Sequence, residues 1–417
     1  EWEVVKLEDK IIRLKSGLSR KLSSSDIGLP MLRSNNLKNN KISFKKLLFW
    51  YRDDPQGART SDFFLNDEDI LVNFINSTAQ IGKAAMFFNQ LDRDVIYTTN
   101  LFRLVVDKSK LNSLFFLNFT NTWEYRKYIM AITKPAVNQA SFTTKDYKRL
   151  LIPLPPLPEQ TRIANCLSTW DRAIATTRHL LEQLKTRKKG LMQRLLTGEV
   201  RLPGFTGEWE VQRIGDHLER HKEKTDSSDQ YPVLTSSRTG LYFQADYYNK
   251  QVASKDNTGY NVVPRGYFTY RHMSDDLVFK FNVNTLCDRG IVSTLYPVFK
   301  NKYSINKEYL LALLNESSHF KRHALMQKQG GSRTYMYFEK LSSMKAPLPP
   351  LPEQTAIAAV LTAADREIAL YEAKLSTLEA QKRGLMQQLL TGQKRLVAGD
   401  RTLEGPADAS RSSALKN

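Results

Sequence analysis

One segment of about 50 residues occurs twice in this 417-residue chain. Residues 153–202 and 347–396 align without gaps at an offset of 194 positions, and 29 of the 50 aligned positions are identical. The stretches that precede the two copies also begin alike, with EWEVVKL at 1–7 and EWEVQRI at 208–214. Such a duplication predicts two equivalent units, each made of a variable block of about 150 residues followed by a near-constant segment.

The near-constant segment predicts a long helix of the coiled-coil type. Its PLPPLP opening is not expected to be helical, because proline fixes φ and lacks an amide hydrogen. Glu159 and Gln160 then begin a helix with a carboxylate at its electropositive end, and Gly198 and Gly392 stop the two copies. Between these limits, apolar residues recur in alternating steps of four and three, which is the pattern of a coiled-coil seam. The main seam residues are Ile163, Leu167, Ile174, Leu181, Leu184, Leu191 and Leu195 in the first copy and Ile357, Leu361, Ile368, Leu375, Leu378, Leu385 and Leu389 in the second.

Each predicted helix spans about 38 residues, or roughly 57 Å. A seam of this length exposes too much apolar surface to stand alone, so we expect the two copies to pair antiparallel, as a spacer with one globular domain toward each end. The alternatives are that each helix docks on its own domain or on a homodimer partner. Lys188 and Lys382 interrupt both copies at the same heptad position, where a cation sets the register at some cost in stability.

The variable blocks have the mixed pattern of α and β structure. We therefore expect an α+β protein in which two mixed α/β domains are separated by two long helices. Short strands are predicted at 69–74, 84–88 and 95–97 and, in the second block, at 231–234, 260–263, 267–270 and 291–298, with helices within 111–132 and over 305–317. The predicted boundaries are 1–152 and 203–346 for the domains, 153–202 and 347–397 for the helical segments, and 398–417 for a disordered or vector-derived tail.

Charge indicates the kind of partner. Lys and Arg number 62 against 43 Asp and Glu, a net charge of +19, and the excess is spread over residues 1–158, 159–207 and 208–352. A basic excess spread over most of a chain favours a large polyanion such as nucleic acid. The sequence has no apolar run of about 18 residues and no signal peptide, so we expect a cytoplasmic protein without a membrane span.

Catalytic motifs are missing from the sequence. It contains no GxGxxG, no phosphate-binding loop of the Walker type and no Asn/Asp-Pro-Pro-aromatic motif of amino-methyltransferases. The ExK form at 372–374 falls on the predicted coiled coil and is interpreted as a solvated face. We expect no metal site either, because the histidine pairs 217/221 and 319/323 have no further ligands and lie close to arginines. Cys166 and Cys287 are too few for a disulfide framework or a multi-cysteine zinc module, and we expect both to be packing residues.

Polar loop residues between the predicted strands are the candidate DNA contacts. Arg is suited to guanine and Asn or Gln to adenine, through paired hydrogen bonds, while Ser and Thr contact bases or phosphates. Any one such loop taken alone is more often an ordinary turn, but loops of this kind occur in both blocks of a basic chain. The candidates are Arg33, Ser34, Asn35, Asn36, Asn76, Ser77, Thr78, Gln80, Lys83, Thr98 and Asn100 in the first block and Thr235, Ser236, Arg238, Arg271, His272 and Arg333 in the second.

These features together resemble the specificity subunits of type I restriction–modification systems. The sequence LPPLPEQxxIAxxL followed by GLMQxLLTG is a highly specific signature of this family and occurs here twice. The resemblance covers nearly the whole chain, because each signature follows one of the two variable blocks. The connector at 202–205 before 208–210, and Gly290–Ser293 with Tyr296, are also similar to the family. One departure is that the chain begins at Glu1 without a methionine, so we expect a short amino-terminal stretch to be missing.

The resemblance implies a chain without catalytic activity of its own. The two variable blocks are implied to be target recognition domains, each for one half of a split, asymmetric sequence in double-stranded DNA. The paired helices are implied to set the spacing and to dock two modification subunits, which carry S-adenosylmethionine and methylate adenine at N6. Separate restriction subunits, with ATP and Mg²⁺, are implied to cleave unmodified DNA. The half-sites are expected to differ, with centres about one helical turn apart.

Two rival interpretations remain open at this point. A stand-alone DNA-binding or bridging protein with a coiled-coil spacer has the same charge and the same seam, but binds its site without a partner. An enzyme with an unfamiliar nuclease or methylase centre acts on DNA in isolation, given magnesium or S-adenosylmethionine.

Overall fold

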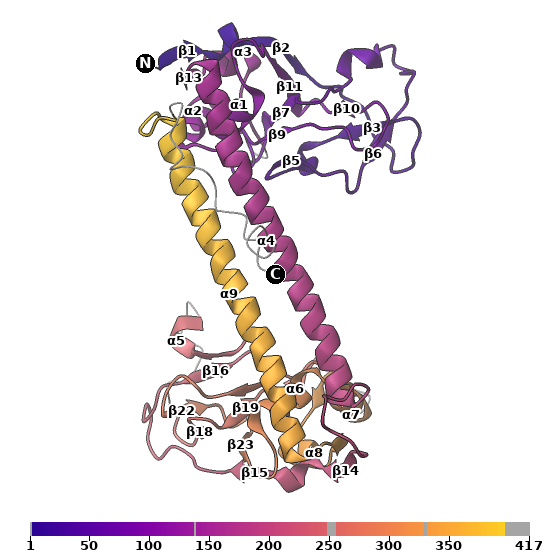
Figure 1. Cartoon of the computed structure of the whole chain (residues 1–417), viewed down its shortest axis with the longest axis vertical. Helices are drawn as coiled ribbons and strands as arrows, with labels where there is room; N and C mark the ends of the chain where they lie inside the picture. Colours follow the sequence, from indigo (N-terminus) through magenta and orange to yellow (C-terminus); the bar gives the residue numbers. More distant parts are fainter. Residues whose placement is uncertain (1, 137–138, 248–255, 329–331, 397–417) are drawn as a thin grey trace, which may run out of the picture. The chain divides into compact units, whose positions relative to one another are not determined.

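The computed structural model describes residues 2–136, 139–247, 256–328 and 332–396 (Figure 1). The chain divides into two compact units, of which the first comprises residues 1–178 and 374–417 and the second residues 179–373. Each unit contains one variable block and one part of each long helix. The predicted fold class, two mixed α/β domains with two long helices, is confirmed. The predicted tail at 398–417 lies outside the described residues.

The first unit contains the strands β1 to β13 and the first helices. The strands are β1 Glu3–Lys6, β2 Ile11–Ser16, β3 Leu29–Leu32, β4 Leu37–Lys38, β5 Asn40–Ile42, β6 Leu48–Trp50, β7 Ile70–Asn73, β8 Ile75–Asn76, β9 Ala84–Met86, β10 Ile96–Tyr97, β11 Leu101–Val106, β12 Ala140–Ser141 and β13 Leu151–Leu154. The helices are α1 Ser113–Phe119, α2 Trp123–Ile132, α3 Thr144–Lys148 and the start of α4 Leu157–Thr197, with 3₁₀ turns η1 Leu7–Lys10, η2 Ser34–Asn36 and η3 Thr60–Phe63.

The second unit contains the strands β14 to β25. These are β14 Glu210–Arg213, β15 Leu218–His221, β16 Leu234–Ser236, β17 Leu241–Phe243, β18 Asn261–Pro264, β19 Phe268–Tyr270, β20 Met273–Ser274, β21 Phe281–Val283, β22 Arg289–Val292, β23 Val298–Asn301, β24 Thr334–Tyr335 and β25 Lys345–Leu348. Its helices are α5 Gln244–Tyr247, α6 Lys307–Glu316, α7 Ser318–Met326, α8 Phe338–Ser342 and the start of α9 Leu351–Leu390, with the 3₁₀ turn η4 Ile214–His217.

The same four-stranded antiparallel arrangement occurs in both units. It has the order β2-β11-β7-β9 in the first and β15-β23-β19-β21 in the second, and the first unit extends it with β5 and β4. In each unit the first strand pairs antiparallel with the strand before the long helix, as in Glu3↔Leu154 and Glu210↔Leu348. The repeated EWEV start therefore closes each domain against the beginning of its own near-constant segment.

The cores join the sheets to the helices. In the first unit, Phe102 and Phe115 are buried in one cluster with Ile163 of α4 and Leu389 of α9. In the second unit, the corresponding cluster joins Phe268, Leu310, Leu195 of α4 and Ile357 of α9. Burial of this apolar surface holds each domain on the helix pair.

The helices α4 and α9 pack together and run antiparallel. In the first unit, the ammonium of Lys382 lies 2.6 Å from Asp171, and the guanidinium of Arg178 lies 2.6 Å from Glu379. A later residue of α4 thus meets an earlier residue of α9. In the second unit, Lys185 lies 2.8 Å from Glu372, and Lys188 pairs with Asp365. The predicted pairing of the two copies within one chain is confirmed, and all fourteen main seam residues are buried or partly buried.

A buried carboxylate joins the start of α4 to the segment that follows α9 in the first unit. Glu159 accepts hydrogen bonds from Nε and Nη2 of Arg395, both at 2.7 Å, and from the indole of Trp2 at 3.3 Å. The guanidinium also lies over the Trp2 ring. Burial by itself raises the pKa of Glu159, but the hydrogen bonds from Arg395 and Trp2 outweigh it, so the pKa lies below its usual value.

The second unit repeats this arrangement with a glutamate of the second copy and an arginine of the first. Glu353 accepts hydrogen bonds from Nε and Nη2 of Arg201, both at 2.6 Å, and from the indole of Trp209 at 3.1 Å. We call the two sets, Trp2–Glu159–Arg395 and Trp209–Glu353–Arg201, the Trp–Glu–Arg clusters. From the sequence, Glu159 was predicted only to begin a helix, although each member of the first cluster recurs in the other repeat unit.

The glutamine after each glutamate binds the start of a shorter helix in the variable block of its unit, α1 or α6. Gln160 accepts a hydrogen bond from the backbone N–H of Asn112 at 2.8 Å, and Gln354 does the same for Asn306 at 2.9 Å. Asn112 and Asn306 are the N-caps of α1 and α6. One side chain therefore links a helix start of the near-constant segment to a helix start of the variable block.

Some predicted elements need correction. The predicted strand at 291–298 is wrong in its middle, because a turn closed by the Tyr296 N–H and the Ser293 carbonyl separates β22 from β23. Of the predicted strand at 231–234, only Leu234 belongs to a strand. The helices α4 and α9 begin two residues before the predicted start, since a proline is tolerated in the first helical turn. Gly198 and Gly392 follow the helices with φ of 75° and 76°, as the sequence predicts.

Candidate nucleic-acid interface

The polar loops of the first unit surround two adjoining hollows. The smaller, of about 440 Å³, is lined by the candidates Arg33, Ser34, Asn35, Asn76, Thr98 and Asn100. The larger, of about 820 Å³, is lined by the candidates Ser34, Asn35, Asn76, Gln80 and Lys83. Three residues line both hollows, so eight of the eleven candidates of this unit share one polar surface.

Strand ends position these side chains. Asn76 ends β8, Thr98 and Asn100 lie between β10 and β11, and Ser34 begins the turn after β3. The Ser34 hydroxyl donates to the Asn73 side chain at 3.2 Å, which joins the turn to β7. A surface of amides and hydroxyls at strand ends is suited to hydrogen bonding with base edges and phosphates.

Several cations and amides of this surface were not predicted from the sequence. Arg20 and Gln139 line the smaller hollow, and Lys38 and Arg126 line the larger one. The Arg20 guanidinium donates to Asp54 through Nε at 2.9 Å, and this hydrogen bond lowers the pKa of Asp54 to about 2. Arg126 and Gln139 lie far from the predicted loops in sequence, so only the fold brings them to this surface, whereas Lys38 lies two residues after the predicted loop at 33–36.

Asn36 is a correction to the prediction. Its side chain is 2% exposed, donates to the Ser43 carbonyl at 2.8 Å and accepts from the Arg33 N–H at 2.9 Å. It therefore holds the loop that presents Arg33 rather than facing a ligand. Ser77 and Thr78 are exposed but do not line either hollow.

In the second unit, the structure brings two of the predicted arginines together. Arg238 donates to both carboxylate oxygens of Asp276, at 2.7 and 2.8 Å, and Nε of Arg333 donates to Asp275 at 3.0 Å. The two aspartates are adjacent in sequence. Arg271, which lies between β19 and β20, is exposed.

The other three candidates of the second unit are corrected to buried residues. Thr235, Ser236 and His272 are 8%, 6% and 5% exposed. The Ser236 hydroxyl accepts a hydrogen bond from Asn282 at 2.8 Å, so it serves the core of the domain. Nδ1 of His272 is bonded to the Leu295 carbonyl, and burial lowers the pKa of the imidazole.

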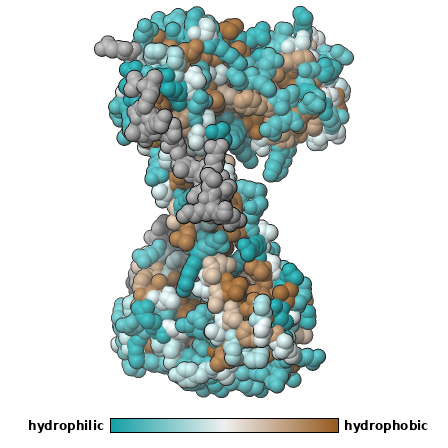
Figure 2. Space-filling model, in the orientation of Figure 1, coloured by the Kyte–Doolittle hydropathy of each residue, from teal (hydrophilic) through white to brown (hydrophobic). Residues whose placement is uncertain are grey.

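A cationic hollow of about 520 Å³ in the second unit was not predicted. Arg220, Lys222 and Lys224 line it together with His272 and Tyr337. Arg220 is paired with Glu339, which also lines the hollow, so Lys222 and Lys224 beside the aromatic ring are the cations suited to a phosphate backbone. Figure 2 shows that hydrophilic residues cover much of the visible face of both globular parts, with hydrophobic residues between them.

Two histidines of the predicted pairs contact polar groups of the protein itself. His217 lies 2.8 Å from both Ser304 and Gln212, and His323 lies 2.8 Å from the Lys340 carbonyl. Within the described ranges, no group of three or more His, Cys, Asp and Glu side chains is arranged to hold a metal ion. In the same part of the chain, no helix combines the length and the apolar character needed to cross a bilayer.

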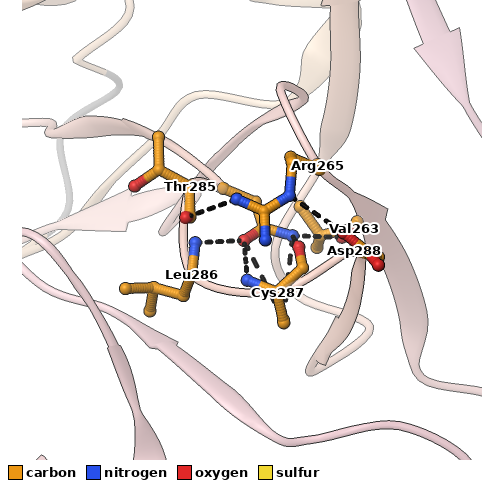
Figure 3. Close-up of polar contacts among 7 residues, drawn as sticks. Val263, Arg265, Thr285, Leu286, Cys287 and Asp288 are labelled. Carbon is orange, nitrogen blue, oxygen red and sulfur yellow. Dashed lines mark hydrogen bonds and ion pairs between the residues drawn. The ribbon is translucent and has the colours of Figure 1, made fainter.

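Cys287 belongs to a tight turn of the second unit (Figure 3). The Asn284 amide donates to the Val263 carbonyl at 2.7 Å and the Cys287 carbonyl at 3.0 Å. Arg265 crosses the same turn, with Nε 3.0 Å from Asp288 and Nη1 donating to the Thr285 carbonyl (Figure 3). Burial raises the pKa of the Cys287 and Cys166 thiols, so neither has the lowered pKa of a reactive cysteine.

A duplicated α/β domain, each copy followed by one helix of an antiparallel coiled-coil pair, defines the class of this protein. The family model for the type I restriction modification DNA specificity domain matches residues 1–186 and 206–380. The chain belongs to this family of type I restriction–modification specificity subunits.

Similar proteins agree with this assignment. The chain is 29% identical to a putative type I restriction enzyme MjaX specificity subunit of Methanocaldococcus jannaschii, over 95% of this chain and 94% of the relative. It is 25% identical to the type I restriction enzyme MjaVIII specificity subunit of the same organism, over 95% and 93%. The crystal structure of the HsdS subunit from Thermoanaerobacter tengcongensis has the same fold, with a TM-score of 0.51, 17% identity and coverage of 94% and 97%.

Proposed function

We propose that this chain is the non-catalytic subunit that selects the DNA sequence in a type I restriction–modification complex. Each unit binds one half of a split, asymmetric site in double-stranded DNA. The observation that supports this most directly is that the two units share the four-stranded sheet and the Trp–Glu–Arg cluster but have different loop side chains. The first offers mainly amides and hydroxyls, and the second offers arginines held by aspartates.

The rest of the proposal concerns the coiled coil and the partner subunits. The helices α4 and α9 have 41 and 40 residues, so each is about 60 Å long. Two modification subunits dock along this pair and carry S-adenosylmethionine for methylation of adenine at N6. Restriction subunits, which use ATP and Mg²⁺, join the same complex. This division of labour fits a sequence that lacks the motifs of a methyltransferase or a nucleoside triphosphatase.

A pull-down and a methylation map test this proposal. The full chain is produced in a host without other methylation, with and without the methyltransferase subunit of the same system. We expect the two proteins to copurify, and adenine methylation to appear at a two-part, non-palindromic motif only when both are present.

Other outcomes contradict the proposal. Tight sequence-specific binding by the full chain without any copurifying methyltransferase indicates a stand-alone DNA-binding protein. Methylation or cleavage of DNA by the isolated chain, supplied with S-adenosylmethionine or magnesium, indicates an enzyme. A continuous or palindromic methylated motif contradicts the split, asymmetric site.

A further inference from the structure

Two arginines from different loops of the second unit converge on two consecutive aspartates. Arg238 lies in the turn between β16 and β17, and Arg333 immediately precedes β24. Asp275 and Asp276 immediately follow β20, which pairs antiparallel with β24 through Met273↔Tyr335 and Ser274↔Thr334. We call this pair of strands with the two aspartates and Arg333 the β20–β24 ribbon.

These ion pairs are too exposed to matter much for folding. The side chains of Arg238 and Asp276 are 59% and 50% exposed, and those of Arg333 and Asp275 are 51% and 64% exposed. Exposed ion pairs are screened by solvent and add little to stability. An arrangement that brings two arginines from separate loops to adjacent carboxylates therefore needs another explanation.

Asp276 is held in place by the protein. Its Oδ1 accepts a hydrogen bond from the Ser274 hydroxyl at 2.9 Å and from the Val278 N–H at 3.2 Å. The hydrogen bond from Arg238, followed by that from Ser274, lowers the pKa of Asp276 to about 2, so the carboxylate is charged at neutral pH. Since Ser274 is buried, the carboxylate has a fixed position from which to orient the guanidinium of Arg238.

Both guanidinium groups keep donors for a second partner. Arg238 uses one hydrogen of Nη1 and one of Nη2 for Asp276, which leaves Nε–H and the outer Nη–H groups. Arg333 uses Nε for Asp275, which leaves both Nη groups. A pair of parallel N–H donors matches the O6 and N7 acceptors that guanine presents in the major groove.

The ribbon has the form and stiffness for such a contact. A two-stranded antiparallel ribbon fits the major groove of DNA. The ring of Tyr337 stacks on buried His272 at 5.2 Å and parallel to Tyr335 at 5.9 Å, which supports the β24 side of the ribbon. A supported ribbon keeps the arginines oriented before DNA binds, which lowers the entropic cost of binding.

The first unit has the corresponding ribbon without the charges. There β8 pairs with β12 through Ile75↔Ser141 and Asn76↔Ala140. Asn76 occupies the register position of Ser274, and Gln139 precedes β12 as Arg333 precedes β24. Asn and Gln pair with adenine rather than guanine.

We propose that Asp275 and Asp276 are positioning residues that hold Arg333 and Arg238 to recognise guanine in the half-site bound by the second unit. This inference rests on the proposed function. It predicts guanines in one half-site whose recognition depends on carboxylates that do not themselves touch DNA.

Selection from randomised duplexes tests the inference. The full chain with its methyltransferase subunit is incubated with a randomised duplex pool, and the bound fraction is sequenced for wild type, Asp276→Asn and Arg238→Lys. We expect both substitutions to lower the preference for guanine at the same position by about 5- to 150-fold, the range for one bidentate base contact. The other half-site should be unchanged. Binding of Asp276→Asn to unrelated DNA should stay equal or increase, because a negative charge is removed.

A matched control is Asp288→Asn, which breaks the exposed pair between Arg265, just after β18, and Asp288, just before β22 of the same unit (Figure 3). It should leave every base preference unchanged. A uniform gain in affinity of Asp276→Asn for all duplexes, with the guanine preference intact, overturns the positioning role while the proposed function stands. Failure of the wild-type complex to select any motif overturns the proposed function itself.

Discussion

The two units of this protein have the same frame and different recognition surfaces. The Trp–Glu–Arg clusters, the glutamines that bind the N-caps of α1 and α6, and the four-stranded sheets recur in both. The ribbons differ, with amides in the first unit and paired arginines and aspartates in the second. Duplication thus preserved the residues that join each domain to the helices, while the exposed strand ends changed.

The largest expected effect concerns the two Trp–Glu–Arg clusters, which should contribute equally to the stability of their units. The Glu353 and Glu159 side chains are 0% and 4% exposed, and each binds an arginine through two hydrogen bonds. Replacing either by Gln removes the charge partner of an arginine that is itself 24% (Arg201) or 40% (Arg395) exposed and therefore partly rehydrated, so we expect Glu353→Gln and Glu159→Gln each to lower the free energy of unfolding by about 2–4 kcal/mol. Urea denaturation of the full chain measures this. The control Glu379→Gln, at a more exposed pair, should have little effect.

Acidification should destabilise the cluster in the first unit. The pKa of Glu159 in the folded protein lies below its usual value of 4.5, so on acidification the unfolded state binds a proton at this carboxylate at a higher pH than the folded state does. The stabilisation that the charged Glu159 carboxylate gives to the folded protein is therefore complete above about pH 4.5, and it is lost as the pH falls through the pKa of Glu159 in the folded state. Melting temperatures between pH 3 and 7 should fall less steeply in Glu159→Gln than in wild type. Parallel curves for the two proteins would contradict this.

A smaller effect is expected at the glutamines. Gln160→Ala and Gln354→Ala remove the acceptor for the N–H of Asn112 and Asn306, and a buried donor left unpaired costs about 1–3 kcal/mol. Thermal unfolding of the two variants should show similar losses. A loss confined to one variant would show that the glutamines do not have equivalent roles.

The smallest effect is expected at the lysines of the seam. Asp171→Asn and Asp365→Asn each remove the partner of a lysine, but these carboxylates are 47% and 59% exposed. We expect at most about 1 kcal/mol from either, reduced further by added salt. A much larger loss in urea denaturation would mean that the lysines determine helix register more strongly than their exposure suggests.

The sequence was sufficient to predict what depends on local periodicity. The alternation of apolar residues from Ile163 to Leu195 predicted the helix and its seam, because the heptad spacing places these residues on one face. The proline-rich openings and Gly198 marked the ends of the first helix within two residues.

Features that depend on distant residues were not predictable in this way. The Glu159–Arg395 pair joins residues 236 positions apart, and the Arg333–Asp275 pair joins residues 58 apart. Composition of a loop also did not distinguish Asn35, which is exposed, from Asn36, which its own loop buries. Exposure within a turn depends on backbone folding that neighbouring residue types do not reveal.

The central claim is that one chain recognises two different half-sites with two separately altered surfaces. Methylation maps from cells that carry the methyltransferase subunit with wild type, Asn76→Ala or Arg238→Ala measure this most directly. We expect each substitution to relax the methylated motif in one half only, with the two variants affecting opposite halves. A motif in which both substitutions change the same half, or in which both halves change together, would contradict the account.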